Sequence, residues 1–294
     1  MGATQPGREA DLSADRGEMM RAKFIDVDGV NTRYLEAGTG PAVVLLHGVG
    51  MSGDCFHRNM DALSRDYRVI APDMLGHGFT GYRGFDGQPP PLAMARHIVA
   101  LLDVIGVKQG CVLGSSLGGL VAGLTHFERP GLVSKLVLAA SSSCFNAPEQ
   151  QEVVLKASAA NALNAMKDPT LEGLRTRLRN IVFAESGVSE ELLLVQLTSY
   201  AYPDRAVAYA DTINQIIETI YDPAGQVSHR LDGITIPVLM IAGRDDIRTP
   251  VDRQIAGVTR FPSAQLEIYE QCGHFPFLEH PLRFYDDLTA FLRK

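Results

Sequence analysis

Residues 111–120 read CVLGSSLGGL, and this stretch decides the fold. An apolar run ends at Ser115, and a helical pattern begins two residues later with no loop between them. A strand that enters a helix directly through G-x-S-x-G makes a sharp turn that lifts the central serine above the sheet. Only Ser116 has glycines two residues away on both sides, Gly114 and Gly118. Ser116 is therefore either a nucleophile at the edge of a sheet or an ordinary helix N-cap.

Other apolar runs repeat this pattern along the chain. Their ranges are 22–27, 32–38, 42–48, 67–73, 110–115, 134–141, 237–243 and 264–270. Continuous apolar runs are typical of strands buried on both faces, and helical patterns at 91–106, 117–129 and 281–293 separate or follow them. The first two runs, joined around Asp28-Gly29, indicate an antiparallel hairpin. We predict an α/β protein with a mostly parallel eight-stranded sheet flanked by helices.

One interval breaks the alternation of strands and helices. Residues 144–232 contain helical patterns but no convincing strand, which indicates a helical insertion in the sheet domain. We expect a core domain formed by residues 23–143 and 233–294, with 144–232 as a helical cap. Residues 1–22 are polar, and we expect them to form a flexible N-terminal tail.

Composition narrows the class of protein. The 294 residues carry a net charge of −7 without a cluster of Lys and Arg, which argues against nucleic acid as a partner. No apolar run is long enough for a signal peptide or a membrane span. The four cysteines lack metal-ligand spacing, and we interpret them as reduced thiols. We expect a cytoplasmic protein without a metal or cofactor, and a homodimer is the assembly to test.

A nucleophilic serine needs a histidine base and a carboxylate that orients it. His274 directly follows the last predicted strand, at the edge of the sheet where Ser116 would stand. Asp245 and Asp246 follow the preceding strand, and the order Ser, Asp, His along the chain is that of sheets with this turn. A solvated acidic turn is the alternative for both aspartates.

Two backbone amides would complete an oxyanion hole. The amide of Leu117 is free at the start of the helix that follows Ser116, and the loop after the third run reads HGVG. Gly48 and Gly50 allow this loop to approach a reacting carbonyl, and Val49 N–H is the expected second donor. An ordinary glycine turn is the alternative.

Taken together, these segments resemble the α/β-hydrolases over residues 24–294. The matching pieces are HGVGMSG, APDMLGHGFT, GSSLGG, GRDDIRTP and CGHFPFLEHP, in the order of that family. The resemblance implies that Asp246 is the acid of a Ser116-Asp246-His274 triad. It also implies that the inserted interval is a cap over the substrate pocket.

Among capped members, the layout is similar to carboxylesterases and to the hydrolases of meta-cleavage products. Three positions depart from the second group. Ser115 stands where those enzymes have Asn, Gln196 where their cap has Arg, and Phe275 where a Trp follows the histidine. We take these three residues as candidates for the substrate pocket.

The departures favour a small apolar substrate over an anionic one. The expected function is hydrolysis of a largely apolar carboxylic ester, lactone or aryl ester through an acyl-enzyme on Ser116. The first alternative is carbon–carbon bond hydrolysis of 2-hydroxy-6-oxo-dienoates by the same triad. An alternative of another class is a ligand receptor on the same fold.

Overall fold

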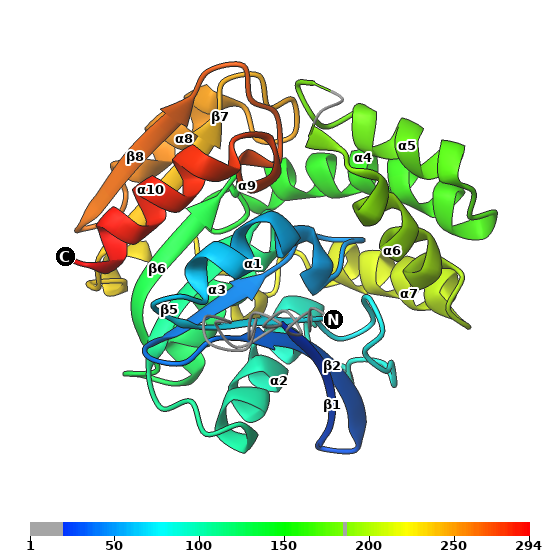
Figure 1. Ribbon diagram of the computed structural model, residues 1–294, viewed down its shortest axis with the longest axis horizontal. Helices are drawn as coiled ribbons and strands as arrows, with labels where there is room; N and C mark the ends of the chain where they lie inside the picture. Colours follow the sequence, from blue (N-terminus) through cyan, green and yellow to red (C-terminus); the bar gives the residue numbers. More distant parts are fainter. Residues whose placement is uncertain (1–19, 185–186) are drawn as a thin grey trace, which may run out of the picture.

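Eight strands form one sheet in the computed structural model, which describes residues 20–184 and 187–294 (Figure 1). Their order is β1-β2-β4-β3-β5-β6-β7-β8, with antiparallel pairing at β1–β2 and β2–β4 and parallel pairing elsewhere. The bounds are β1 Arg21–Val27, β2 Val30–Ala37, β3 Ala42–Leu46, β4 Arg68–Pro72, β5 Gly110–Ser115, β6 Val133–Ala139, β7 Val238–Gly243 and β8 Ala264–Tyr269. The predicted sheet and its N-terminal hairpin are confirmed.

The predicted N-terminal tail, residues 1–22, extends past the beginning of the first strand. Its residues up to 19 lie outside the described part of the chain, but Arg21 and Ala22 already belong to β1. They pair with Glu36 and Leu35 of β2, because backbone pairing in an edge hairpin does not require apolar side chains.

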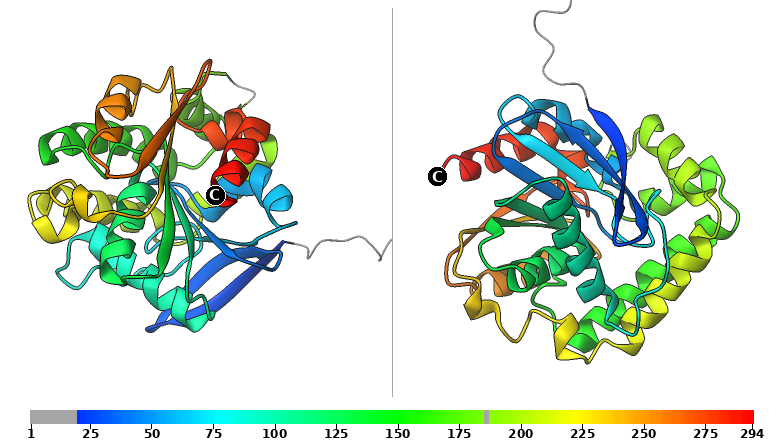
Figure 2. Two further views of the ribbon diagram at one scale, coloured as in Figure 1. Left: turned by 90° about the vertical axis from the view of Figure 1, so that its left-hand side faces the viewer. Right: turned by 90° about the horizontal axis from the view of Figure 1, so that it is seen from below.

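Helices cover both faces of the sheet, as the edge-on view in Figure 2 shows. Helices α1 and α10 lie on one face, and α3 and α8 lie on the other, where α2 packs against α3. Their bounds are α1 His57–Leu63, α2 Pro90–Val104, α3 Leu117–Glu128, α8 Val251–Val258 and α10 Pro281–Leu292, with the short α9 Pro276–Glu279 before α10. Continuous burial of β3, β5 and β7 follows from this double cover.

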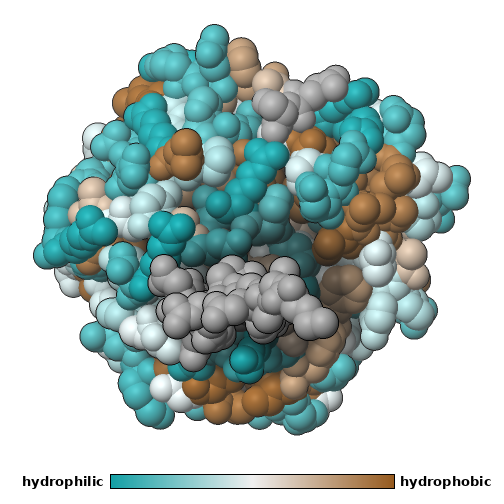
Figure 3. Space-filling model, in the orientation of Figure 1, coloured by the Kyte–Doolittle hydropathy of each residue, from teal (hydrophilic) through white to brown (hydrophobic). Residues whose placement is uncertain are grey.

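Between β6 and β7 the described chain forms helices and short 3₁₀ turns, without a strand. The helices are α4 Pro148–Lys167, α5 Leu171–Arg179, α6 Glu190–Tyr200 and α7 Arg205–Glu218, called the cap helices below. They lie beyond the carboxyl ends of the parallel strands (Figure 1). Figure 3 shows apolar side chains among polar ones on this side of the molecule. The cap helices are thus placed over the sheet edge at which β5 ends.

None of the helices in residues 20–184 and 187–294 is both long and apolar enough to cross a membrane. All four cysteines are buried and free, namely Cys55, Cys111, Cys144 and Cys272.

Candidate active site

Ser116 adopts a backbone conformation that is uncommon for a residue with a side chain. Its φ is 51° and its ψ is −120°, and its hydroxyl makes no capping hydrogen bond to α3. A Cβ on Gly114 would lie 2.1 Å from the Gly118 carbonyl oxygen, and one on Gly118 would lie 2.3 Å from that of Leu46. Glycine at both positions therefore allows the sharp turn, and the N-cap alternative for Ser116 lacks its hydrogen bond.

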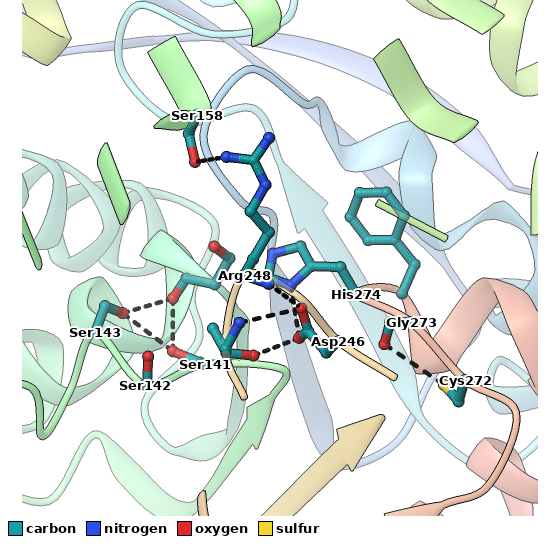
Figure 4. Close-up of polar contacts among 12 residues, drawn as sticks. Ser141, Ser142, Ser143, Ser158, Asp246, Arg248, Cys272, Gly273 and His274 are labelled. Atoms are coloured by element: carbon teal, nitrogen blue, oxygen red, sulfur yellow. Dashed lines mark hydrogen bonds and ion pairs between the residues drawn. The ribbon is translucent and has the colours of Figure 1, made fainter. Parts of the chain in front are cut away.

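The structure brings Asp246, rather than Asp245, against His274 (Figure 4). His274 Nδ1 lies 2.8 Å from Asp246 Oδ2, while within residues 20–184 and 187–294 the Asp245 carboxylate accepts only a long bond of 3.3 Å from the Cys272 amide. Asp246 also accepts hydrogen bonds from the amides of Arg248 and Thr249 and from the Thr249 hydroxyl. These contacts hold the carboxylate in one orientation toward the imidazole.

Electrostatics keep the Asp246 carboxyl ionised. Burial by itself would raise its pKa, but the charge and hydrogen bond of His274 and the hydrogen bonds from Thr249 outweigh this effect. The pKa of Asp246 therefore lies below its usual value. An ionised carboxylate at Nδ1 leaves Nε2 of His274 as the nitrogen that would take a proton from a nucleophile.

The loop after β3 lies directly beside Ser116. A Cβ on Gly48 would be 3.1 Å from the Ser116 Cβ, and Val49 borders the space in front of the serine. His47 Nδ1 donates to the Gly48 carbonyl oxygen at 2.8 Å, and its Nε2 accepts from the Met74 amide at 3.0 Å. Since Nε2 accepts, the proton of this neutral imidazole is on Nδ1. His47 thereby orients the peptide between Gly48 and Val49.

Gly50, the other predicted glycine of this loop, has a different place. Its φ is 70°, and a Cβ there would lie 2.9 Å from an Arg177 guanidinium nitrogen and 3.1 Å from the Tyr209 ring. Gly50 therefore supports the base of the loop against the cap helices, and Gly48 is the glycine that faces Ser116.

Two cavities meet at Ser116. One is lined by Ser116, His274, Gly48 and Phe275, and the other is lined by Ser116 and Leu117. Ser116 and His274 thus face one space, although no hydrogen bond joins their side chains among the described residues. Catalytic hydrogen bonds are often long before substrate binds, so this geometry is compatible with a nucleophile and its base.

Two hydroxyls hold the carbonyl of Ser116. Ser141 Oγ and Ser143 Oγ, in the loop after β6, lie 2.6 and 2.7 Å from the Ser116 carbonyl oxygen (Figure 4). The Gly119 amide donates to the same oxygen at 3.0 Å. Because the amide and carbonyl of a trans peptide point in opposite directions, these bonds also orient the Leu117 N–H.

Two arginines line the first cavity, and neither was predicted. Arg177 comes from α5 and is buried, while Arg248 extends from the loop after β7 toward Ser158 of α4 (Figure 4). Arg248 Nη1 lies 3.1 Å from Ser158 Oγ, and Arg177 Nη1 lies 3.5 Å from the Met51 sulfur. Within the described parts of the chain, neither guanidinium forms a salt bridge.

Of the three predicted pocket residues, one lines a cavity at Ser116. Phe275 lines the first cavity, but neither of the two cavities is lined by Ser115 or Gln196. Ser115 ends β5 with its side chain fully buried below the turn, and the buried amide of Gln196 has no hydrogen-bond partner in the described residues. The structure thus places both residues outside the lining of these two cavities, because the turn raises Ser116 alone and because α5 supplies a cation at the first cavity.

A signal for Arg177 exists in the sequence. Leu174, Arg177 and Leu178 occupy positions i, i+3 and i+4, which form one face of a helix, and all three are buried. Arg175 and Arg179 fall on other faces. An arginine on an otherwise apolar face needs a partner. No local sequence pattern shows that Arg177 faces the cavity at Ser116.

The fold and this arrangement of serine, histidine and carboxylate define an α/β hydrolase. A family model described as alpha/beta hydrolase fold matches residues 41–281, and the chain belongs to that family.

Similar proteins include hydrolases of ring-cleavage products. A 2-hydroxy-6-oxononadienedioate/2-hydroxy-6-oxononatrienedioate hydrolase of Burkholderia vietnamiensis is 32% identical over 290 residues, covering 94% of this chain and 97% of that protein. The structure of a meta-cleavage product hydrolase from Pseudomonas fluorescens (CumD) is 25% identical, with a TM-score of 0.76 and coverage of 92% and 97%. An epoxide hydrolase, at 22% identity and a TM-score of 0.74, shares the fold, covering 94% of this chain and 99% of its own.

Proposed function

We propose that this chain hydrolyses a carbon–carbon bond beside a ketone in a small 2-hydroxy-6-oxo-dienoate. The main observation in support of this proposal is that Arg177 and Arg248 line the same cavity as Ser116 and His274. A carboxylate is the natural partner of two guanidiniums that form no salt bridge within the described parts of the chain. The names of the relatives support the same reaction, so the ester expectation becomes the second candidate.

The ester expectation depended on three departures, which are Ser115, Gln196 and Phe275 where the hydrolases of meta-cleavage products have Asn, Arg and Trp. Arg177 and Arg248 supply a cation to the cavity in the absence of an arginine at position 196, and Ser115 lines neither cavity. Phe275 does line the first cavity, so this departure still favours an apolar substrate. The same triad would open an ester, so the choice between the two reactions depends on the substrate that the cavity binds.

The proposed reaction begins when the dienol is converted to its keto form, which moves one proton from oxygen to carbon. Ser116 Oγ then attacks the ketone carbon, and His274 takes the hydroxyl proton while Asp246 stabilises the imidazolium. The amides of Val49 and Leu117 donate to the alkoxide. Cleavage of the carbon–carbon bond leaves its electron pair on the conjugated enolate, which receives a proton. Water then releases the acid from Ser116, with His274 as base.

Residues 144–232 would act as the cap in this proposal. The cap helices supply Ser158 and Arg177 to the cavity, and the His274 amide donates to the Ile181 carbonyl oxygen just after α5 at 2.8 Å. A direct bond between the cap segment and the histidine loop supports a pocket formed jointly by both parts of the chain.

The test compares 2-hydroxy-6-oxo-6-phenylhexa-2,4-dienoate with p-nitrophenyl esters of short acids. We expect kcat/KM for the dienoate to exceed that for the esters by at least about 100-fold, because only the dienoate presents a carboxylate to the arginines. Efficient ester cleavage with negligible loss of the dienol absorbance would overturn the proposal in favour of the esterase.

The Ser116→Ala variant separates an enzyme from a receptor. Loss of the nucleophile should lower kcat by several orders of magnitude while substrate still binds. Unchanged turnover in this variant would exclude Ser116 as the nucleophile.

A further inference from the structure

Glu279, the last residue of α9, joins two segments that are far apart in the sequence. Its carboxylate accepts hydrogen bonds from the amides of Gly273 and Phe275, on either side of His274, at 3.1 Å each. It also accepts one at 2.7 Å from the amide of Phe183, which follows α5. One carboxylate therefore connects the loop of the candidate base, residues 273–275, to the cap. We call these three residues the histidine loop.

Backbone groups meet at the same junction. The His274 amide donates to the Ile181 carbonyl oxygen at 2.8 Å. A Cβ on Gly273 would lie 2.7 Å from that oxygen and 2.7 Å from the Phe183 amide nitrogen. Residues 181–183 and the histidine loop thus lie in direct backbone contact, and glycine at position 273 permits this close approach.

The Glu279 carboxylate is only partly compensated for its burial. Burial raises the pKa of Glu279 above its usual value, although the three amide donors and the nearby His280 act in the opposite direction. A neutral side chain of the same shape would avoid the cost of burying a charge. The effect of such a replacement on the histidine loop would therefore come from the lost hydrogen bonds.

His274 depends on its backbone for its place in the site. Asp246 fixes Nδ1 of the imidazole at 2.8 Å, but the residue itself stands in a short connection between β8 and α9. The hydrogen bonds to Glu279 and to Ile181 engage all three amides of the histidine loop. A misplacement of about 1 Å at a catalytic group can lower a rate by about 100-fold, so the hold on this loop bears on the reaction.

We propose that Glu279 is a positioning residue for His274, whose carboxylate fixes the histidine loop against residues 181–183 and so places the base and the cap as one unit. Glu279 lines neither of the two cavities at Ser116, so it would act through His274 rather than on the substrate. This inference rests on the proposed role of His274 as the base, and it applies to either candidate substrate.

Glu279→Gln is the main test. Glutamine has one acceptor oxygen, so it can serve either the histidine loop or the Phe183 amide, while its NH₂ group opposes the other donor. We expect kcat for 2-hydroxy-6-oxo-6-phenylhexa-2,4-dienoate to fall by about 10-fold, with KM within about twofold of the natural chain. A loss confined to KM, or a kcat within about twofold of the natural chain, would overturn the inference.

Glu270→Gln is the matched control. Glu270 lies four residues before His274, is exposed and pairs with Arg244 at 2.7 Å. Removing its charge leaves the contacts of the histidine loop in place, so kcat should stay within about twofold of the natural chain. Equal losses of kcat in the two variants would also overturn the inference, because they would show a general effect of charge.

Two measurements on Glu279→Gln need no turnover. Amide hydrogen exchange, followed by mass spectrometry, should become at least about 10-fold faster at residues 181–183 and 273–275 and stay unchanged elsewhere. The downfield proton NMR signal of His274 Nδ1–H, bonded to Asp246, should broaden. These results would support the inference even if neither substrate class is cleaved, in which case only the proposed function fails. Unchanged exchange in both segments, or an unchanged signal, would overturn the inference.

Gly187→Ala provides the test if Glu279→Gln does not fold. The new Cβ would lie 2.8 Å from Glu279 Cγ, so it should displace that side chain without changing its charge. We expect the same local rise in exchange and a fall in kcat of about 3-fold to 10-fold. Gly81→Ala is the control, because its Cβ would meet its nearest neighbour at 3.4 Å. The same kcat and exchange in both alanine variants would overturn the inference.

Discussion

The Ser141 hydroxyl donates to the carbonyl oxygen of Ser116 over 2.6 Å, so a side chain from the loop after β6 holds the peptide that follows the nucleophile candidate. Ser143 reaches the same oxygen at 2.7 Å. The positive φ of Ser116 is strained, and hydrogen bonds to its carbonyl stabilise that conformation. The loop after β6 therefore takes part in the site without supplying a charge.

Replacing both hydroxyls should disturb the oxyanion hole more than substrate binding. In Ser141→Ala/Ser143→Ala we expect kcat to fall by about 10-fold with KM nearly unchanged, because the Leu117 N–H loses its fixed direction. Ser64→Ala, which removes a hydroxyl bonded to the Asp61 carbonyl oxygen at the end of α1, is the control. A rise in KM at constant kcat would show that the two serines act on binding instead.

Asp246→Asn should reduce kcat by roughly 10³- to 10⁴-fold, because an amide does not fix the tautomer of His274 or stabilise the imidazolium. Asp245→Asn provides the adjacent control, since Asp245 is exposed and, within the described residues, its carboxylate accepts a hydrogen bond only from the Cys272 amide. Steady-state kinetics on the same substrate compare the two. Similar losses in both variants would contradict the assignment of Asp246.

His47 should make stability depend on pH. Burial lowers the pKa of His47 from 6.5 to about 4. Between these two pH values the imidazole is therefore largely protonated in the unfolded chain and largely neutral in the folded chain. The unfolded state binds more protons in this window, and stability is therefore lost as the pH falls from 6.5 toward 4. The slope from this one group is about 1.4 kcal/mol per pH unit.

Urea unfolding across this pH window measures the effect of His47. His47→Asn, whose amide can still donate to the Gly48 carbonyl oxygen, should show a shallower loss of stability than the natural chain. Asp73, whose pKa lies near 6, remains in both proteins and cancels in the comparison. The charge of His47 also contributes to the lowered pKa of His77, so the variant relieves part of that effect and acts in the same direction. Parallel curves would rule out His47 as the source of the slope.

Gly118→Ala should destabilise the fold by at least about 3 kcal/mol, since the new Cβ would lie 2.3 and 2.6 Å from the carbonyl oxygens of Leu46 and His47. Gly81→Ala is the control, because its Cβ would meet the Val30 side chain at an ordinary 3.4 Å. Thermal unfolding measures both. Equal melting temperatures would mean that α3 can move away from β3.

Much of this structure could be predicted from local sequence patterns. The strand-to-helix turn at Ser116, the continuous apolar strands and the Asp28-Gly29 hairpin follow from short-range rules, because side-chain periodicity and glycine geometry act over a few residues. The closeness of His274 to Ser116 follows from one further rule, that parallel strands end at a common edge.

The sequence by itself determined the sheet, the nucleophile candidate and the order of its partners, since each depends on contacts within one strand, one turn or one sheet edge. Only the tertiary structure decided between Asp245 and Asp246 by geometry, placed Ser115 and Gln196 away from the cavities and brought Arg177 beside Arg248. Those outcomes depend on how α5 and the loop after β7, about 70 residues apart, pack over Ser116. No periodicity in the chain encodes the direction from which a distant helix presents one side chain.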